Sequence, residues 1–149
     1  SPRGRLFTQK VAKELVLQPE WVVLCGRYEG VDERILQHYQ MDEISLGDFI
    51  LSGGEIAAMT MIDACLRLVG GVIRGAHAHE DESFALAQGL EPLLEYPHYT
   101  RPAEWRGLTV PEVLISGHHE AVKQWRLSQA QEVTKKRRPE MWSAYRNKA

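Results

Sequence analysis

Apolar and polar positions repeat with two different periods along residues 1–70. Residues 21–25, Trp-Val-Val-Leu-Cys, form an unbroken apolar run that is typical of a strand buried on both faces. Short apolar pieces at 43–46 and 49–51 predict two further strands. Helical spacing occurs at 31–40, at 54–69 and from a predicted Thr8 N-cap to about Leu17. Strands that alternate with helices predict an α/β fold with a parallel sheet.

The pattern changes after residue 70. Gly, Pro, His and acidic residues dominate 70–111, which predicts a long loop, and loops of this length are usually functional. A short apolar piece at 110–116 precedes a basic helical pattern at 118–136, and a short terminal helix follows Arg138-Pro139. We therefore expect a first domain at 1–75, a linker at 76–104 and a helical domain at 105–149.

Two glycine-rich turns are the first candidates for a ligand-binding site. Cys-Gly-Arg-Tyr-Glu-Gly at 25–30 and Leu-Ser-Gly-Gly-Glu at 51–55 each end an apolar run and open a helical pattern. Ligands of parallel sheets bind at the carboxyl ends of the strands, and backbone N–H groups at a helix start can face them. The turns predict a small-molecule pocket built mainly from main chain, although tight turns between strands would also use these glycines.

Composition narrows the class of protein. With 149 residues, 44% of them hydrophobic, the chain can build a core. The net charge of −2 hides an asymmetry, because the segment from His119 onward has eight basic and three acidic residues. That segment carries +5 and the remainder −7, which indicates a polyanion-binding surface or a solvated charged face.

Several classes of site and location are disfavoured by the sequence. Cys25 and Cys65 are too few for a disulfide framework or a metal knuckle, and we expect both to be reduced core residues. The histidines lack the spacing of a zinc pair, so no metal site is expected. Asp63 and Arg67 interrupt the longest apolar stretch, 56–69, which is also too short to span a bilayer. No signal peptide is visible, so we expect a cytoplasmic protein without membrane contact.

Five segments resemble signatures of the bacterial tRNA (guanine-N1-)-methyltransferases, which belong to the knotted, SPOUT-type methyltransferases. They are 25–34, 45–55, 96–102 (Tyr-Pro-His-Tyr-Thr-Arg-Pro), 113–119 (Val-Leu-Ile-Ser-Gly-His-His) and Trp125-Arg126, in the family's order. The resemblance implies a trefoil-knotted parallel-sheet domain followed by a small all-helical tRNA-binding domain, working as a homodimer. It also implies methyl transfer from S-adenosylmethionine to N1 of the guanosine 3′-adjacent to the anticodon.

The chain departs from the family at a few positions. Arg3 stands where the family usually has Gln, and Ala57 replaces a common Pro. The family also has an N-terminal stretch of about half a domain that precedes the position of Ser1. That stretch carries early strands and a glycine-rich loop of the guanosine pocket, so we expect the sequence to be a truncated piece.

The resemblance also implies which residues hold the cofactor. Three loops of the knot would bind S-adenosylmethionine, with glycine main chain at the adenine edge and the ribose, and Leu46 and Leu51 as apolar walls. The full implied set is Pro2, Gly26, Tyr28, Glu29, Ser45, Leu46, Gly47, Asp48, Phe49, Ile50, Leu51, Gly53 and Gly54.

Methylation at N1 requires a general base, because that nitrogen bears a proton at neutral pH. The family has Asp directly before Ser-Phe; counting from Arg67 favours Glu82, whereas residue type favours Asp81. We favour Glu82, and the competing interpretation is a solvated acidic run. Arg67 is expected to stabilise the charge on the neighbouring carbonyl oxygen, unless it pairs with Asp63 one turn earlier. Mg²⁺ is implied by the family, but no dedicated cage is visible.

The basic C-terminal segment would bind tRNA. Lys-Lys-Arg-Arg at 135–138 can neutralise phosphates without reading bases. Trp125, Trp142 and Tyr145 either stack on unpaired bases or pack within the helical domain. A non-catalytic RNA- or nucleotide-binding protein is the rival interpretation. A nucleotide hydrolase is disfavoured because the sequence has no GxxxxGK[ST] loop.

Overall fold

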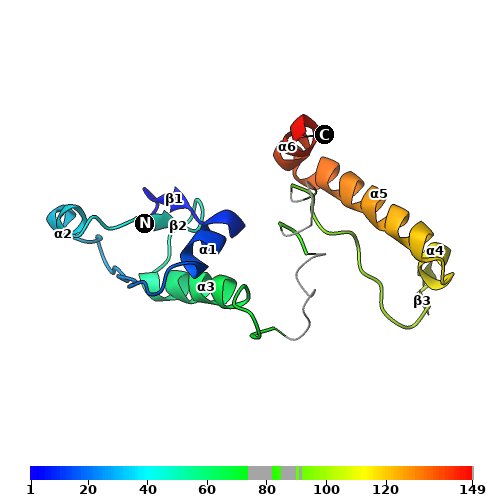
Figure 1. Ribbon diagram of the computed structural model, residues 1–149, viewed down its shortest axis with the longest axis horizontal. Helices are drawn as coiled ribbons and strands as arrows, with labels where there is room; N and C mark the ends of the chain where they lie inside the picture. The colour runs from blue at the N-terminus through cyan, green and yellow to red at the C-terminus, as the bar shows by residue number, and fades with distance from the viewer. Residues whose placement is uncertain (74–81, 85–89, 91, 149) are drawn as a thin grey trace. The chain divides into compact units, whose positions relative to one another are not determined.

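The computed structural model describes residues 1–73, 82–84, 90 and 92–148, and divides the chain into two compact units. The first unit is Ser1–Gly75 and the second is Ala76–Ala149. The first contains β1 (Arg5–Leu6), α1 (Gln9–Val16), α2 (Glu33–His38), β2 (Ile44–Ser45) and α3 (Gly54–Leu66) (Figure 1). The second contains β3 (Glu104–Trp105), β4 (Leu108–Thr109), α4 (Glu112–Ile115), α5 (His119–Arg137) and α6 (Pro139–Lys148).

A small parallel sheet forms in the first unit, so the expected mixed α/β architecture is confirmed. β1 pairs with β2, with Arg5 opposite Ile44 and Leu6 opposite Ser45. The buried strand predicted at 21–25 is wrong, because this segment has no strand structure and Val22 is 90% exposed. A strand needs a neighbour for its backbone groups, and none of the described residues pairs with this run. The strand expected at 49–51 is likewise absent from the described structure.

Helices α1 and α3 pack together to form the core of the first unit. As predicted, Thr8 caps α1, accepting a hydrogen bond from the Val11 N–H at 3.4 Å. The buried residues of α3 recur at three- and four-residue spacing, and α1 contributes two adjacent buried residues. Together they are Val11, Ala12, Ala58, Met61 and Cys65.

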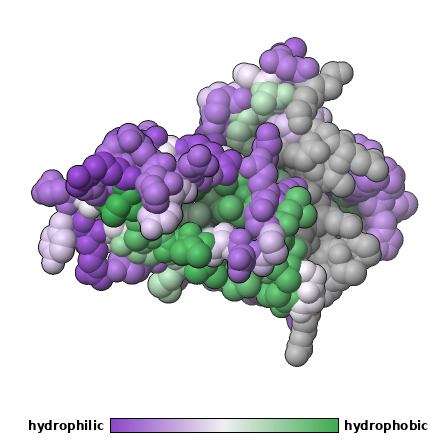
Figure 2. All heavy atoms as spheres, turned by 60° about the vertical axis from the view of Figure 1, so that its left-hand side comes forward, coloured by the Kyte–Doolittle hydropathy of each residue, from purple (hydrophilic) through white to green (hydrophobic). Residues whose placement is uncertain are grey.

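A second face of α3 is apolar but exposed. Ile56, Met59, Ile62 and Leu66 lie on it, and each is between 41% and 68% exposed. Apolar side chains are visible together in the space-filling view (Figure 2). The helix ends at Leu66, three residues before the predicted end, because Leu68 and Val69 donate to carbonyls only three residues back.

The second unit is built around α5. Leu93 and Ala130 are fully or nearly fully buried, and partly buried side chains pack against them. Those side chains are Leu90, Tyr96, Leu127, Trp142 and Tyr145. Helices α5 and α6 each begin within one residue of the predicted position. The segment expected to be wholly helical also contains part of a β3–β4 hairpin, whose turn residues Arg106 and Gly107 both have positive φ.

Candidate cofactor-binding site

The two glycine turns meet in the first unit. The Gly54 N–H donates to the Gly26 carbonyl at 3.0 Å, and Arg27 forms an antiparallel bridge with Gly53. The contact joins the end of the 21–25 segment to the first residue of α3. Main-chain groups of both turns are therefore concentrated around one point.

Glycine is required at position 54 by this close approach. A Cβ atom there would lie 2.8 Å from the Cys25 Cα and 3.2 Å from the Gly26 nitrogen. Both neighbours are backbone atoms, so they can move away only if the turns separate. Gly54 therefore lets two main-chain segments touch, as we expect for a pocket lined by main chain.

A charged pair fastens the same junction. Arg27 donates from Nε to Glu55 Oε1 at 2.9 Å, and its Nη2 lies 2.7 Å from the same oxygen. The backbone N–H of Glu55 and the Arg27 guanidinium hold the pKa of this carboxyl below its usual value. Neither residue was predicted from the sequence to belong to the site, although each directly follows one of the glycines of the two turns.

The N-terminal segment lies beside the beginning of the 45–54 segment. The Ser1 ammonium donates to the Ile44 carbonyl at 2.8 Å, and the Arg5 N–H donates to the Glu43 carbonyl at 2.9 Å. Pro2 is thereby placed next to β2. The structure thus holds 45–54 at both ends, by Ser1–Arg5 at its start and by Gly26–Arg27 at its end.

Arg3, which replaces the family's usual Gln, adds ion pairs to this end of the unit. Its Nη2 lies 3.1 Å from Glu33 and 3.2 Å from Glu43 carboxylate oxygens. These pairs, with Glu33 the larger contributor, hold the pKa of the Arg3 guanidinium above its usual value. Arg3 and Glu33 are exposed and Glu43 is partly buried, so we assign these pairs a positioning effect on α2 and β2 rather than a large contribution to stability.

The 45–54 segment makes a tight turn around Gly47. The buried Ser45 hydroxyl accepts from the Gly47 N–H at 3.2 Å, and the Phe49 N–H donates to the Gly47 carbonyl at 3.0 Å. Gly47 has a φ of +147°, which disfavours any side chain there. The remaining residues predicted to bind cofactor are mostly exposed, and Leu46 is half-buried. The exposed set is Pro2, Tyr28, Glu29, Asp48, Phe49, Ile50 and Leu51.

The residues predicted to act in catalysis belong to different units. Arg67 is the exposed C-cap of α3, where a cation interacts favourably with the helix dipole, and its N–H donates to the Asp63 carbonyl at 3.1 Å. Glu82 is half-buried and lies in the second unit. Asp81 lies outside the described residues.

Among the described residues, no three histidine, cysteine, aspartate or glutamate side chains are grouped as they would be around a metal ion. In the same part of the chain, every helix is too short or too polar to span a lipid bilayer.

Comparisons with known proteins identify the family of the chain. The sequence model of the family described as "tRNA (Guanine-1)-methyltransferase TrmD" matches residues 1–144. The chain is 54% identical over 145 residues to the tRNA (guanine-N(1)-)-methyltransferase of Rhodospirillum rubrum, covering 97% of this chain and 59% of that protein. It is 50% identical to the proteins of the same name from Ruegeria pomeroyi and Gluconobacter oxydans, again over 97% of this chain and covering 58% and 60% of those proteins. The chain thus spans about three fifths of the length of these relatives and belongs to the tRNA (guanine-1)-methyltransferase family.

Proposed function

We propose that this chain supplies the cofactor-binding and RNA-binding parts of an S-adenosylmethionine-dependent tRNA (guanine-N1)-methyltransferase. The contact between Gly26 and Gly54 carries the proposal, because it brings together the two turns that the family resemblance assigns to the cofactor. The relatives' names supply the reaction, transfer of a methyl group to N1 of a guanine in tRNA.

The residues at this junction suit the adenosine part of the cofactor. Main-chain groups of these turns other than the bonded Gly54 N–H and Gly26 carbonyl would bond the adenine edge and the ribose hydroxyls. Leu46 and Leu51 supply apolar walls, and Gly47, Gly53 and Gly54 allow close approach of the backbone. When bound, S-adenosylmethionine supplies an electrophilic methyl group.

Residues of this chain would remove the N1 proton of the guanine and stabilise the negative charge on its carbonyl oxygen. Glu82 takes the N1 proton as the methyl arrives, with Asp81 as the alternative base. Arg67 donates to the guanine carbonyl oxygen, where negative charge gathers. The described residues offer no grouped ligands for Mg²⁺, and no step is assigned to it.

Two surfaces of the chain, the basic side chains of α5 and the exposed apolar face of α3, support its binding partners. The basic residues of α5 suit tRNA phosphates, as the relatives' substrate requires. The exposed apolar face of α3 supports homodimerisation, because large apolar surfaces commonly mark protein interfaces. In such a dimer the linker of one subunit would complete the site of the other. A tRNA substrate supports a cytoplasmic location.

Cofactor binding is tested by calorimetric titration with S-adenosylmethionine. Gly54→Ala should weaken binding at least about tenfold, because the new Cβ forces the turns apart at a cost of about 1–3 kcal/mol. Gly70→Ala is the matched control, since its Cβ would meet nothing within 4 Å. Wild-type protein that is folded but does not bind would contradict the proposal, as would equal binding by both variants.

Methyl transfer is tested in single turnover with tRNA and labelled S-adenosylmethionine. Glu82→Gln should slow transfer at least about a hundredfold, as loss of a general base does, while Asp81→Asn stays near the wild-type rate. The opposite ranking would assign the base to Asp81. Normal rates in both variants would remove the carboxylate base from the proposal.

A further inference from the structure

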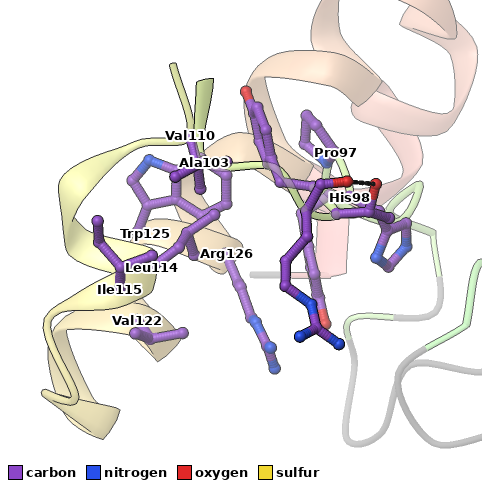
Figure 3. A pocket seen from close by; sticks show the side chains of 13 residues that line it. Pro97, His98, Ala103, Val110, Leu114, Ile115, Val122, Trp125 and Arg126 are labelled. Carbon is purple, nitrogen blue, oxygen red and sulfur yellow. Dashed lines mark hydrogen bonds between the residues drawn. The ribbon is translucent and has the colours of Figure 1, made fainter. Parts of the chain in front are cut away.

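A cavity of about 510 Å³ lies within the second unit, between the 96–103 segment and helices α4 and α5 (Figure 3). Tyr96, Tyr99 and Arg101 line it from the segment, and Trp125 and Arg126 line it from α5. Aliphatic side chains, including Leu114 of α4, form its apolar wall. None of the residues proposed for methyl transfer or cofactor binding lines this cavity.

Aromatic rings and guanidinium groups both line the cavity. The rings of Tyr99 and Trp125 lie 6.1 Å apart at 59°, and the Arg126 guanidinium lies 4.7 Å above the Tyr96 ring. In Figure 3, the side chains of Trp125 and Arg126 both extend from α5. A lining of aromatic rings and arginine side chains suits a ligand that has both a flat π-face and negative charge.

The charge of the lining is positive. Arg101 and Arg126 both line the cavity and are exposed, whereas none of its thirteen lining residues is a carboxylate. The nearby carboxylate of Glu95 is 2.9 Å from the imidazole of His98, so it is engaged by another lining residue. The cavity therefore favours an anionic ligand.

Its size agrees with a nucleotide. Small-molecule sites commonly have volumes of about 300–1,000 Å³, and unpaired RNA bases are bound by stacking on aromatic and arginine side chains. We propose that the cavity takes one unpaired nucleotide of the tRNA, other than the methylated guanosine. Its base lies against Tyr99 and Trp125, and its flanking phosphates lie near Arg101 and Arg126. This inference rests on the proposed function, which supplies the RNA.

The test measures binding of unfractionated bacterial tRNA to the complete 149-residue chain, by fluorescence anisotropy over a series of salt concentrations. Trp125→Leu should weaken binding about tenfold at every salt concentration, because stacking is lost and no charge is removed. Trp105→Leu is its matched control, since Trp105 is 57% exposed and does not line the cavity. The control should bind as the wild type does.

A second pair of variants guards against misfolding of the Trp125 variant. Arg126→Met changes an exposed side chain and should lower the slope of log affinity against log salt by about one. Lys123→Met removes the same charge from the same helix, but Lys123 does not line the cavity. This variant should bind tRNA about ten times more tightly than the Arg126→Met variant does. Circular dichroism verifies that all four variants are folded.

The outcomes separate the two proposals. Wild-type binding that falls in the cavity variants but not in their controls supports the nucleotide site. Wild-type binding that falls equally in cavity variants and controls overturns the nucleotide site and leaves the methyltransferase proposal standing. A wild-type chain that does not bind tRNA overturns both.

Discussion

Cys25 and Cys65 have different surroundings, although the sequence predicts two core cysteines. Cys65 is 5% exposed and its thiol donates to the Ala12 carbonyl, and burial raises its pKa. Cys25 is half-buried beside Gly26, so only the prediction for Cys65 is confirmed. We expect iodoacetamide to label Cys25 at least about tenfold faster than Cys65, because the thiolate is the reactive form and access is needed.

Mass spectrometry of the labelled peptides checks this ratio, with guanidinium-unfolded protein as the control in which the rates should converge. Faster labelling of Cys65 would contradict the packing of α1 against α3. Because Cys25 directly precedes Gly26, S-adenosylmethionine should also slow labelling of Cys25 without changing that of Cys65.

The lowered pKa of Glu55 makes the glycine-turn junction sensitive to acid. Its carboxylate is favoured in the folded state by its own backbone N–H and by Arg27. This stabilisation is fully present above the unfolded pKa, near 4.5, and is lost as the pH falls through the lower folded value. We therefore expect the urea midpoint, followed by circular dichroism, to fall on acidification below this range.

Glu55→Gln should flatten that acid dependence, because the neutral amide does not titrate. Glu20→Gln, which alters an exposed carboxyl group outside the junction, is the matched control and should keep the wild-type dependence. An unchanged pH profile in Glu55→Gln would show that the Arg27 pair does not fasten the turns.

At the scale of residues, the sequence identified the glycines of the two turns but not the Arg27–Glu55 pair that joins the turns. Gly26 and Gly54 stand out because glycine has few reasons to follow an apolar run other than a turn or a close approach. Arg27 and Glu55 look like ordinary surface charges until the fold places them 2.7 Å apart. Long-range pairs of this kind have no local signal, so the sequence predicted the turns and their residues but not the pair that joins them.

At the scale of elements, Thr134 ties the 92–96 segment to α5. Its buried hydroxyl donates to the Ala130 carbonyl at 2.7 Å and accepts from the Leu94 N–H at 2.8 Å. Thr134→Val keeps the shape but leaves that N–H without its acceptor, which should cost about 1–3 kcal/mol. Urea unfolding followed by circular dichroism measures the loss.

Thr60→Val is a closely matched control for this change. Thr60 lies in α3, and its hydroxyl donates to the Ile56 carbonyl four residues earlier, as Thr134 does within α5. Its side chain is exposed, so the substitution should change stability by less than about 0.5 kcal/mol. Equal effects of the two substitutions would mean that the bond to Leu94 contributes nothing.

Helices were predicted more accurately than strands, for a physical reason. The Thr8 cap and the Arg138-Pro139 break act on neighbouring residues, so their effects can be inferred locally. Residues 21–25 have the composition of a buried strand, yet strand formation depends on a partner that may come from anywhere in the chain. The two-residue strands of the 104–109 hairpin are too short to show alternation.

For the whole molecule, the distribution of charge matters more than the net value of −2. The segment from His119 onward carries +5, and the last turn of α5 holds Lys135, Lys136 and Arg137, all of them exposed. Arg138 follows and pairs with Glu140, which lowers the pKa of that carboxyl. The two lysines are therefore good candidates for contacts with tRNA phosphates.

Replacing both lysines, Lys135→Gln with Lys136→Gln, should weaken tRNA binding most at low salt. Each lost phosphate contact removes released counterions, so the slope of log affinity against log salt should fall by about 1.5. The matched control is Lys10→Gln with Lys13→Gln, which removes the same charge from exposed positions of α1. Anisotropy titrations at several salt concentrations give both slopes. If the two double variants lower the slope equally, tRNA responds only to total charge, and the C-terminal segment is a solvated face rather than a binding surface.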